Sequence, residues 1–324
     1  MTRKQVLVFR ELPSDQLARL QAEHEVQVAN PRVPEQRDAF FAALPAAQGL
    51  IGSSFAIDAA VLAQAPRLQV ISSISVGVDN YDLAALQARN VMLCHTPGVL
   101  TETTADTLFA LVMATSRRLL ELALHVREGH WLRNIDESLY GWDVHGKTLG
   151  VLGYGRIGQA LASRAALGFG MPVLYHNPLR VEAAELEGRA RHLPLDELLA
   201  AADIVALTLP LNDQTRGLMN ASRFAQMKAG AILVNGARGA IVDEAALLAA
   251  LDSGHLRAAG LDVFATEPLP LDSPLRRHPR VTALPHIGSA THETRHAMAE
   301  LATSNLLAAL RGETPAAVVV PLMR

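Results

Sequence analysis

The stretch of sequence that decides the fold runs from Thr148 to Gly158 and reads TLGVLGYGRIG. It joins an apolar strand pattern to the spacing G-x-G-x-x-G, and the helical pattern QALA follows directly. In such a turn Gly153 allows a tight bend, Gly155 lets the backbone approach a pyrophosphate, and the last glycine permits close packing of helix on strand. The N-terminus of the helix then faces the phosphates. The stretch therefore predicts a dinucleotide-binding site.

Short apolar runs on both sides of this motif predict two parallel sheets. The runs from the motif onward are Leu149–Leu152, Val173–Tyr175, Ile204–Leu207, Ile232–Val234, Ala259–Leu261 and Val281–Leu284. With helical segments between them, they are typical of a doubly wound sheet. The runs before the motif are Val6–Phe9, Val26–Val28, Gly49–Gly52, Val70–Ser72 and Val91–Leu93. These alternate with helical patterns such as Ser14–His24 and Ile57–Gln64, which predicts a second α/β domain.

A long helical pattern connects the two regions. It begins at about Thr103, and its apolar stripe consists of Leu108, Leu111, Val112, Thr115, Leu119 and Leu122. Because many of the other early positions are small, we expect this helix to be buried at a boundary between domains or subunits. Another helical pattern runs from after Gly288 to about Leu310, and Pro315–Arg324 follows it.

Composition restricts the class of protein. The chain has 324 residues, 50% hydrophobic and 19% charged, which suits about two folded domains. The net charge is −3 without blocks of like charge, so we expect neither a nucleic-acid nor a membrane partner. The single cysteine, Cys94, excludes an internal disulfide, and no apolar run approaches the ~20 residues of a membrane span. With no signal-peptide pattern either, we expect a cytoplasmic protein.

The end of the second nucleotide-domain strand bears on cofactor choice. An NAD site normally has an acidic residue there to hold the ribose 2′-hydroxyl. This sequence has no carboxylate at that place and instead offers His176, Asn177 and Arg180. Asn177 can bond a ribose substituent, and Arg180, helped by His176, can pair with a 2′-phosphate. NADP(H) is therefore favoured, while a solvated loop that accepts NAD(H) as well stays open.

Three later strands end in loops that carry Arg238, Glu267 and His286. The carboxyl ends of strands form the ligand crevice of a doubly wound sheet, so these side chains are expected to converge beside a nicotinamide. A cation, a carboxylate and an imidazole form the set needed to reduce a 2-keto acid. Taken singly, each has an ordinary structural explanation: a solvated loop charge, a turn residue before Pro268 and a core histidine.

These motifs resemble the signatures of the D-isomer-specific 2-hydroxyacid dehydrogenases. The matching segments are GYGRIG at 153–158, NGARG at 235–239, GLDVF at 260–264, PHIG at 285–288 and SVGVDN at 75–80. Within that family, GFGMP at 168–172, YHN at 175–177 and GSATHETR at 288–295 are most similar to bacterial glyoxylate/hydroxypyruvate and 2-ketogluconate reductases.

The resemblance implies a fold and roles for individual residues. A Rossmann-type domain at 99–287 would be inserted into a discontinuous, flavodoxin-like substrate domain made of 1–98 and 288–324, with the active cleft between them. Arg238 would bind the substrate carboxylate and carbonyl, and His286 would protonate the carbonyl oxygen. Glu267 would hold His286 and favour its imidazolium form. The substrate would also meet Ser53 and the backbone amides of Val76 and Gly77. The cofactor would contact Thr104, Gly153, Gly155, Arg156, Ile157, Gly158, His176, Asn177, Arg180, Leu209, Pro210, Thr215, Ala237, Asp262 and Gly288.

These observations predict an NADPH-preferring reductase of short 2-keto acids such as glyoxylate, hydroxypyruvate and 2-ketogluconate, acting as a homodimer. One alternative is an NAD-linked relative that oxidises another substrate, of the 3-phosphoglycerate or phosphite type. Another is a non-catalytic, dinucleotide-sensing corepressor or scaffold, although the full catalytic set disfavours it.

Two further motif matches are interpreted as coincidences. The segment 141–148 fits the P-loop spacing, but that motif needs a strand before it and a helix after it, whereas a strand pattern follows here. The segment 292–296 reads HETRH, which fits a zinc-binding helix, but no third ligand is evident, so no metal is expected. Cys94 lies in an apolar strand pattern and is interpreted as a core residue.

Overall fold

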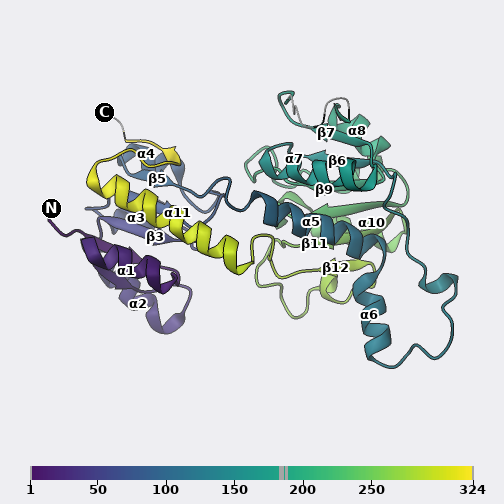
Figure 1. Ribbon diagram of the computed structural model, residues 1–324, viewed down its shortest axis with the longest axis horizontal. Coiled ribbons are helices and arrows are strands. Elements are labelled where there is room, and N and C mark those ends of the chain that lie inside the picture. The colour runs from purple at the N-terminus through teal and green to yellow at the C-terminus, as the bar shows by residue number, and fades with distance from the viewer. Residues whose placement is uncertain (1, 182–185, 187–188, 323–324) are drawn as a thin grey trace. The chain divides into compact units, whose positions relative to one another are not determined.

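Each of the two strand–helix regions folds around a sheet of its own, in which most strands are parallel (Figure 1). The computed structural model describes residues 2–181, 186 and 189–322. The chain divides into unit 1, Met1–Leu100 with Ala290–Arg324, and unit 2, Thr101–Ser289. The predicted boundaries, 98/99 and 287/288, lie two residues before these.

The sheet of unit 1 has the strand order β13-β5-β4-β3-β1-β2. Its strands are β1 Gln5–Val8, β2 Glu25–Val28, β3 Gly49–Gly52, β4 Val70–Ser73, β5 Met92–Cys94 and β13 Val318–Val320. The parallel strands follow the flavodoxin-like order 2-1-3-4-5, which reverses at β1 between β2 and β3. β13 pairs antiparallel with β5 at the edge. The sequence patterns did not predict β13, because its partner lies far earlier in the chain and leaves no local signal.

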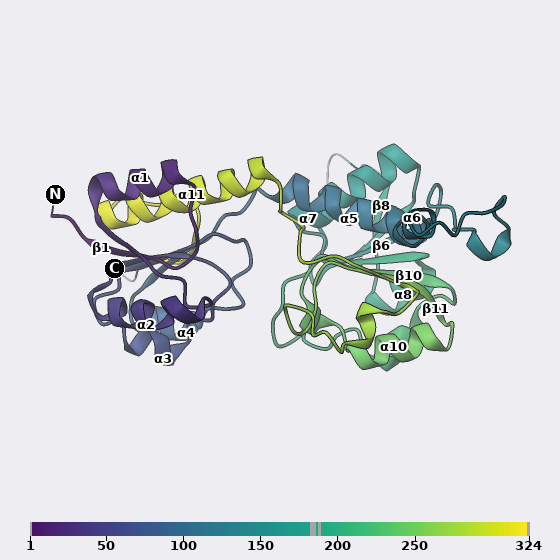
Figure 2. The same cartoon turned by 90° about the horizontal axis from the view of Figure 1, so that it is seen from below.

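Helices cover both faces of this sheet (Figure 2). α1, Ser14–Glu23, and α11, His292–Arg311, lie on one face. α2, Pro34–Ala43, α3, Ala59–Ala63, and α4, Leu83–Ala88, lie on the other. The helix predicted at Ile57–Gln64 is thus shorter, since Asp58 accepts a hydrogen bond from the Val61 N–H and caps α3.

Close packing fixes both helix layers of unit 1. At Gly49 of β3 a Cβ atom would lie 3.1 Å from the Leu306 side chain of α11, so the helix approaches the sheet where the side chain is missing. On the opposite face Phe40 is fully buried and makes edge contacts with the rings of Phe9 and Phe55. Such aromatic contacts add to the free energy of apolar burial.

The sheet of unit 2 has the order β12-β11-β10-β9-β6-β7-β8, with every pair parallel. Its strands are β6 Leu149–Leu152, β7 Val173–His176, β8 Ala190–His192, β9 Ile204–Leu207, β10 Ala231–Asn235, β11 Leu256–Leu261 and β12 Val281–Ala283. This is the Rossmann order 3-2-1-4-5-6 extended by one strand. β8 is the strand that the sequence patterns missed, because its residues are polar and only partly buried at the sheet edge.

Two apolar clusters cover the two faces of this sheet. α5, Thr101–Ser116, and α7, Arg156–Ser163, pack on one face (Figure 2). α8, Leu195–Ala201, α9, Ala221–Gln226, and α10, Glu244–Asp252, pack on the other. The doubly wound sheet predicted from the glycine motif is therefore confirmed.

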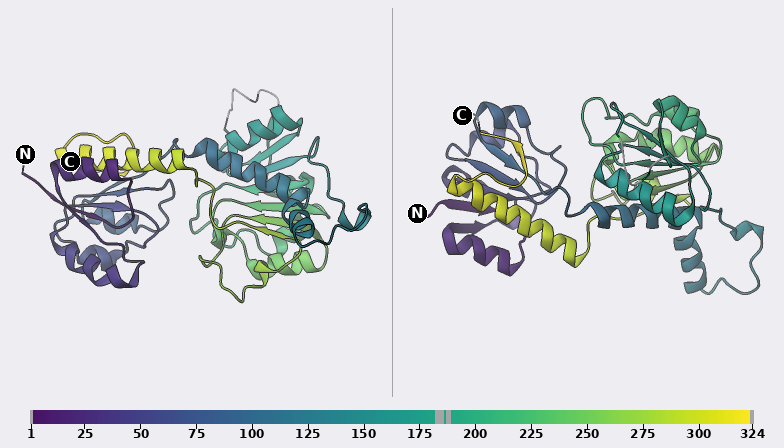
Figure 3. Two further views of the ribbon diagram at one scale, coloured as in Figure 1. Left: turned by 60° about the horizontal axis from the view of Figure 1, so that its bottom comes forward. Right: turned by 45° about the horizontal axis from the view of Figure 1, so that its top comes forward.

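The single long helix predicted from Thr103 is wrong. α5 ends at Ser116, and α6, Leu119–Arg127, begins after Arg118, whose φ of 56° breaks the helix. Leu108 and Leu111 are buried as predicted, whereas Leu119 is 48% exposed. α6 and the loop after it extend away from the rest of unit 2 (Figure 3). Within the described ranges, no helix is long and apolar enough to cross a membrane.

Candidate active site

Two of the three predicted catalytic side chains are in direct contact in unit 2. Glu267, after β11, lies with its Oε2 atom 2.7 Å from Nδ1 of His286, after β12. Arg238 follows the neighbouring strand β10, and its positive charge reaches Glu267 strongly enough to lower the pKa of that carboxyl group. We call the side of each sheet where its strands end the carboxyl edge. The predicted set thus gathers on the carboxyl edge of β10–β12.

The turn after β10 positions Arg238. Asn235, fully buried at the end of the strand, accepts a hydrogen bond from the Ala237 N–H at 3.0 Å and donates to the Arg238 carbonyl at 3.0 Å. Residue 239 must be glycine, because a Cβ there would lie 1.8 Å from the Phe264 carbonyl carbon. The loops after β10 and β11 therefore touch, and Arg238 is half-buried where they meet.

The environment of Glu267 keeps this residue ionised. Its Oε1 atom accepts the Phe264 N–H at 3.0 Å while Oε2 faces His286. Burial favours the neutral acid, but the hydrogen bonds from His286 and Phe264 and the charges of His286 and Arg238 outweigh it, so the pKa of Glu267 lies below its ordinary value. A carboxylate held in this way stabilises an imidazolium beside it.

The backbone of His286 adopts the left-handed conformation, with φ of 55°. Non-glycine residues rarely do so, and such residues cluster at functional sites. The side chain is 48% exposed, and Nε2, the ring nitrogen turned away from Glu267, bonds to no described residue. His286 can therefore present an N–H at Nε2 to a bound molecule.

Asp262 holds the turn that carries His286. It is 2% exposed, and its two oxygens accept the N–H groups of Ile287 at 2.7 Å and Gly288 at 2.8 Å. Burial raises the pKa of Asp262, and these two hydrogen bonds offset only part of that rise. The sequence predicted a cofactor contact for Asp262. It did not predict these two hydrogen bonds, the clamp of Asp262, because they depend on contact between two loops. Thr104 borders the same turn: a Cβ at Gly288 would lie 3.3 Å from the Thr104 methyl group.

The glycine turn after β6 fits a pyrophosphate. A Cβ at Gly153, whose φ is 96°, would lie 2.4 Å from the Leu209 nitrogen, and one at Gly158 would lie 2.4 Å from the Gly153 oxygen. These two glycines thus permit the tight turn and close packing. At Gly155, the N-cap of α7, a Cβ would meet nothing within 4 Å, and no side chain caps the helix. The N-terminus of α7, which begins with Arg156 and Ile157, is therefore open to a phosphate.

The loop after β9 borders the glycine turn. The backbone of Leu209 contacts the turn, since its nitrogen is the atom that a Cβ at Gly153 would meet. The exposed Pro210 follows it. The Thr215 hydroxyl donates to the Pro210 carbonyl at 2.7 Å and accepts the Asn212 N–H at 2.8 Å. These bonds close the loop, and its position supports the predicted cofactor contacts.

Asn177 is tied to both neighbouring segments. Its side-chain oxygen accepts the Tyr154 N–H at 2.8 Å, and its carbonyl oxygen lies 3.0 Å from Nε2 of His192 on β8. The side-chain amide nitrogen of Asn177 is the group that remains for a ribose. His176 lies with Nδ1 3.0 Å from the Leu193 carbonyl, and Arg180 is exposed.

Tyr175 is a residue of this region that the sequence reasoning missed. Its hydroxyl donates to the Val181 carbonyl at 2.6 Å and accepts the Val181 N–H at 3.2 Å. Its ring stacks on Tyr154 at 4.0 Å between centroids. The loop of Asn177 and Arg180 is therefore held at both ends. No sequence signal marks this contact, since the bond forms only once the loop has closed.

The predicted substrate loop of unit 1 presents two N–H groups. The carbonyl of Val76 lies 3.1 Å from Nδ1 of His95, and that of Gly77 accepts the Ser75 hydroxyl at 2.7 Å. The N–H groups of Val76 and Gly77 donate to no acceptor in the described part of the chain. Adjacent N–H groups of this kind form a site for an anion such as a carboxylate. Ser53, also on this edge, is 4% exposed and accepts a hydrogen bond from Arg10.

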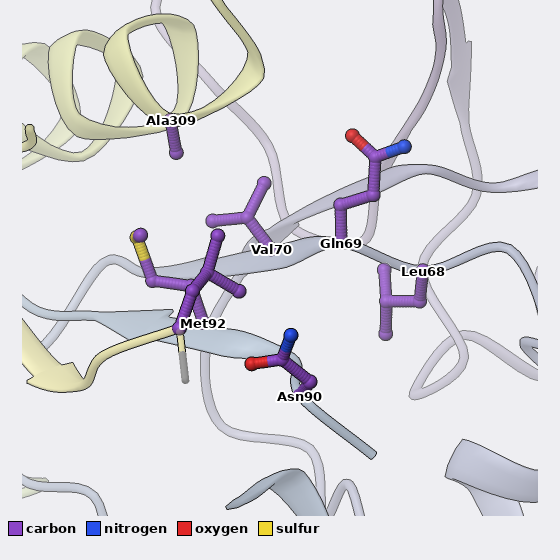
Figure 4. Close-up of a pocket in the computed structure, with 7 residues that line it drawn as sticks. Leu68, Gln69, Val70, Asn90, Met92 and Ala309 are labelled. Atoms are coloured by element: carbon purple, nitrogen blue, oxygen red, sulfur yellow. The ribbon is translucent and has the colours of Figure 1, made fainter. Parts of the chain in front are cut away.

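A hollow at the opposite edge of the unit 1 sheet lacks such chemistry (Figure 4). It has a volume of about 220 Å³, below the roughly 300–1,000 Å³ of typical ligand sites. The lining residues are Leu68, Gln69, Val70, Asn90, Met92, Ala309 and Leu322. None of them can act as an acid, a base or a nucleophile, so the candidate site stays at the carboxyl edges.

The remaining sequence motifs have structural surroundings of their own. Segment 141–148 leads into β6 rather than a helix, unlike a P-loop. His296 lies with Nε2 2.9 Å from Asp15 Oδ2, and the described ranges contain no group of three or more His, Cys, Asp or Glu side chains able to hold a metal ion. Cys94 is fully buried, and this burial raises the pKa of its thiol to about 12.

Comparison with known proteins agrees with this geometry. Residues 109–288 match the family model described as D-isomer specific 2-hydroxyacid dehydrogenase, NAD binding domain. The chain is 51% identical over 317 residues to the glyoxylate/hydroxypyruvate reductase B of Citrobacter koseri and 52% identical over 319 residues to that of Escherichia coli, covering 98% of each chain.

Solved structures give the same result. A Sinorhizobium meliloti NADPH-dependent glyoxylate/hydroxypyruvate reductase, in complex with NADP and malonate, has a TM-score of 0.89 at 31% identity, covering 100% of this chain and 99% of that one. The TT0316 protein of Thermus thermophilus has a TM-score of 0.88 at 46% identity, covering 98% of this chain and 100% of that one.

Proposed function

Because the chain belongs to the D-isomer specific 2-hydroxyacid dehydrogenase family, we propose that it reduces glyoxylate to glycolate and hydroxypyruvate to D-glycerate with NADPH. The observation that carries this proposal is the contact of Glu267 with His286, beside Arg238, on the carboxyl edge of a Rossmann sheet. Relatives named for this activity are about half identical to the chain over nearly their whole length.

The chain's residues supply the proton and hold the substrate in this proposal. The reduced nicotinamide, when bound, supplies the hydride. Nε2 of His286 gives its proton to the carbonyl oxygen, and Glu267 stabilises the imidazolium before that transfer. Arg238 binds the carboxylate with its planar pair of donors and polarises the carbonyl. Return of a proton to His286 from solvent restores the starting state.

The preference for NADPH rests on the segment after β7. The family binds a nicotinamide dinucleotide, and a solved relative contains NADP. Asn177 carries no charge to repel a 2′-phosphate, and Arg180 is exposed and able to pair with it. Arg180→Gln is expected to lower kcat/KM for NADPH about 10-fold or more and to leave that for NADH nearly constant. An equal loss of kcat/KM for both cofactors would show that Arg180 does not bind the 2′-phosphate.

Oxidation of NADPH and of NADH with a panel of keto acids tests the activity. Glyoxylate, hydroxypyruvate and 2-ketogluconate are the substrates to compare, and D-glycerate is the expected product from hydroxypyruvate. Absence of turnover with every acid and both cofactors would contradict the proposal and favour a purely binding role. We propose the cytoplasm as the compartment, since the one cysteine leaves no internal disulfide to form.

Another copy of the chain is the partner that we propose. α6 has no buried residue, and exposed apolar side chains continue through the loop that follows it. They are Leu119, Leu120, Leu124, Val126, Trp131, Leu132, Ile135 and Tyr140. So large an exposed apolar surface marks a protein interface. Leu124→Glu is expected to shift the sedimenting species from dimer to monomer, whereas Leu271→Glu, also exposed and in unit 2, is not. A monomeric wild type would contradict the dimer.

A further inference from the structure

Arg10 lies where the strand order of unit 1 reverses. It follows β1, and its side chain crosses the end of the neighbouring strand β3. There Nη1 donates to the hydroxyl of Ser53 and, at 3.3 Å, to that of Ser54. β1 pairs with β3 on one side and β2 on the other, so Arg10 stands at the switch point of the sheet. Doubly wound sheets bind their ligands at this point.

No carboxylate in the described part of the chain pairs with Arg10. Its side chain is partly buried, and its hydrogen-bond acceptors are the two neutral hydroxyls. Burial lowers the pKa of the Arg10 guanidinium, and the positive charges of Arg295 on α11 and Arg32 after β2 lower it further. A partly buried cation that lies near other positive charges is costly unless an anion joins them.

The two serines that accept hydrogen bonds from Arg10 are also unusual. Ser54 has a φ of 64°, which is rare for a residue with a side chain and is seen most often where function requires it. Beside it, Ser53 is nearly inaccessible, so the guanidinium of Arg10 is the group through which Ser53 acts on a ligand. The contact of Ser53 with substrate stays a prediction, and its burial favours a role in positioning Arg10.

The strand order places Arg10 and the Val76–Gly77 amides on the same edge of the sheet. β4, which leads into that loop, is the strand next to β3. Neighbouring strands lie about 4.8 Å apart, so the Arg10 side chain, which bonds to Ser53 after β3, ends about one strand spacing from the end of β4. A molecule with one carboxylate on these amides would bring a group two or three bonds farther along to Arg10.

We propose that Arg10, positioned by Ser53 and Ser54, binds a second anionic group on the substrate. The substrates it selects are 2-keto acids whose far end carries a carboxylate or a phosphate. This inference rests on the proposed function, because the first carboxylate is the one expected at Val76 and Gly77. Arg10 then favours longer, doubly anionic acids over short acids without a second anionic group.

Specificity measurements test the proposal. The ratio of kcat/KM for oxaloacetate to that for glyoxylate is measured in wild type, Arg10→Gln and Arg10→Lys, and likewise the ratio for 3-phosphohydroxypyruvate to hydroxypyruvate. Arg10→Gln is expected to lower at least one ratio about 10- to 100-fold through KM, and Arg10→Lys to restore part of it. A fall in the oxaloacetate ratio identifies the second anionic group as a carboxylate, and a fall in the 3-phosphohydroxypyruvate ratio identifies it as a phosphate. Arg3→Gln, which removes the same charge beyond the other end of β1, should change neither.

A binding measurement keeps this test separate from the proposed function. Malonate and inorganic phosphate are titrated against wild type and Arg10→Gln, and the rise in Tm is recorded. A rise in wild type that is lost in Arg10→Gln supports the anion site even if no keto acid is turned over. Unchanged ratios together with equal Tm shifts in both proteins would overturn the proposal.

Discussion

The carboxyl edges of the two sheets share an architecture but differ in charge. In unit 2 that edge gathers the carboxylates of the buried Asp262 and the more exposed Glu267 near His286, and both accept backbone N–H groups. In unit 1 it gathers Arg10 and open N–H groups, without a carboxylate bonded to Arg10 among the described residues. In the proposed function the first edge holds and moves a proton, and in the further proposal the second receives an anion. Substitutions at His286 and Glu267 should therefore act on kcat, and substitutions at Arg10 on KM.

The largest expected effect is that of removing the imidazole. His286→Ala takes away the proposed proton donor, and positioned acids contribute about 10²–10⁴-fold to rate, so kcat should fall by that factor. Single-turnover reduction of glyoxylate measures it. NADPH binding, followed by its fluorescence, serves as the control and should persist. A variant that keeps more than half of wild-type kcat would show that the edge of unit 2 does not transfer the proton.

The clamp of Asp262 provides the next test of that edge. Asp262→Asn keeps one acceptor but turns an amide donor toward the second N–H of the turn. An unsatisfied buried N–H costs about 1–3 kcal/mol of unfolding free energy. Denaturant unfolding measures the loss, and kcat should fall with it because the turn carries His286.

Asp243→Asn is the matched control for Asp262. Asp243 caps α10 by accepting one hydrogen bond, from the Ala246 N–H at 3.0 Å, and asparagine caps a helix equally well. The Asp243→Asn variant should therefore have the same free energy of unfolding as wild type. If Asp262→Asn were as stable as this control, the clamp would contribute nothing.

Some of this edge could be predicted from sequence and some could not. Arg238, Glu267 and His286 each follow an apolar strand, and parallel strands bring such positions to one edge; the glycine spacing fixes the turn at Gly153. The local pattern carries no trace of contacts between distant loops, such as those of Asp262 with the turn after β12. Likewise, the break at Arg118 depends on bonds from its side chain to Glu121 and to the Ser138 and Tyr140 carbonyls.

Acid titration sharpens the role of Glu267. The pKa of Glu267 is lower in the folded protein than its ordinary value of about 4.3, so the carboxylate stabilises the fold above that pH, and this contribution is lost as pH falls through the folded pKa. The difference in unfolding free energy between wild type and Glu267→Gln should therefore shrink from pH 7 to pH 3.

The same substitution should lower turnover. Glutamine carries no charge to stabilise an imidazolium at His286, so kcat at pH 7 should fall about 10- to 100-fold. Glu244→Gln is the control, because Glu244 accepts the Ala265 N–H at 2.8 Å and forms no bond to a histidine. An unchanged kcat in Glu267→Gln would leave Glu267 as a structural residue only.

The smallest expected effect concerns cofactor binding on the carboxyl edge of unit 2. Tyr175→Phe removes the hydroxyl that holds both backbone groups of Val181, and each such bond contributes about 0.5–1.5 kcal/mol. The loop that presents Asn177 and Arg180 should loosen, raising the Kd of NADPH about 2- to 10-fold while the Kd of NADH changes less. Tyr140→Phe, at an exposed tyrosine after α6, should alter neither constant. Equal weakening of both cofactors would mean that Tyr175 supports the sheet rather than the phosphate loop, and that the carboxyl edge of β7 does not select the 2′-phosphate through this contact.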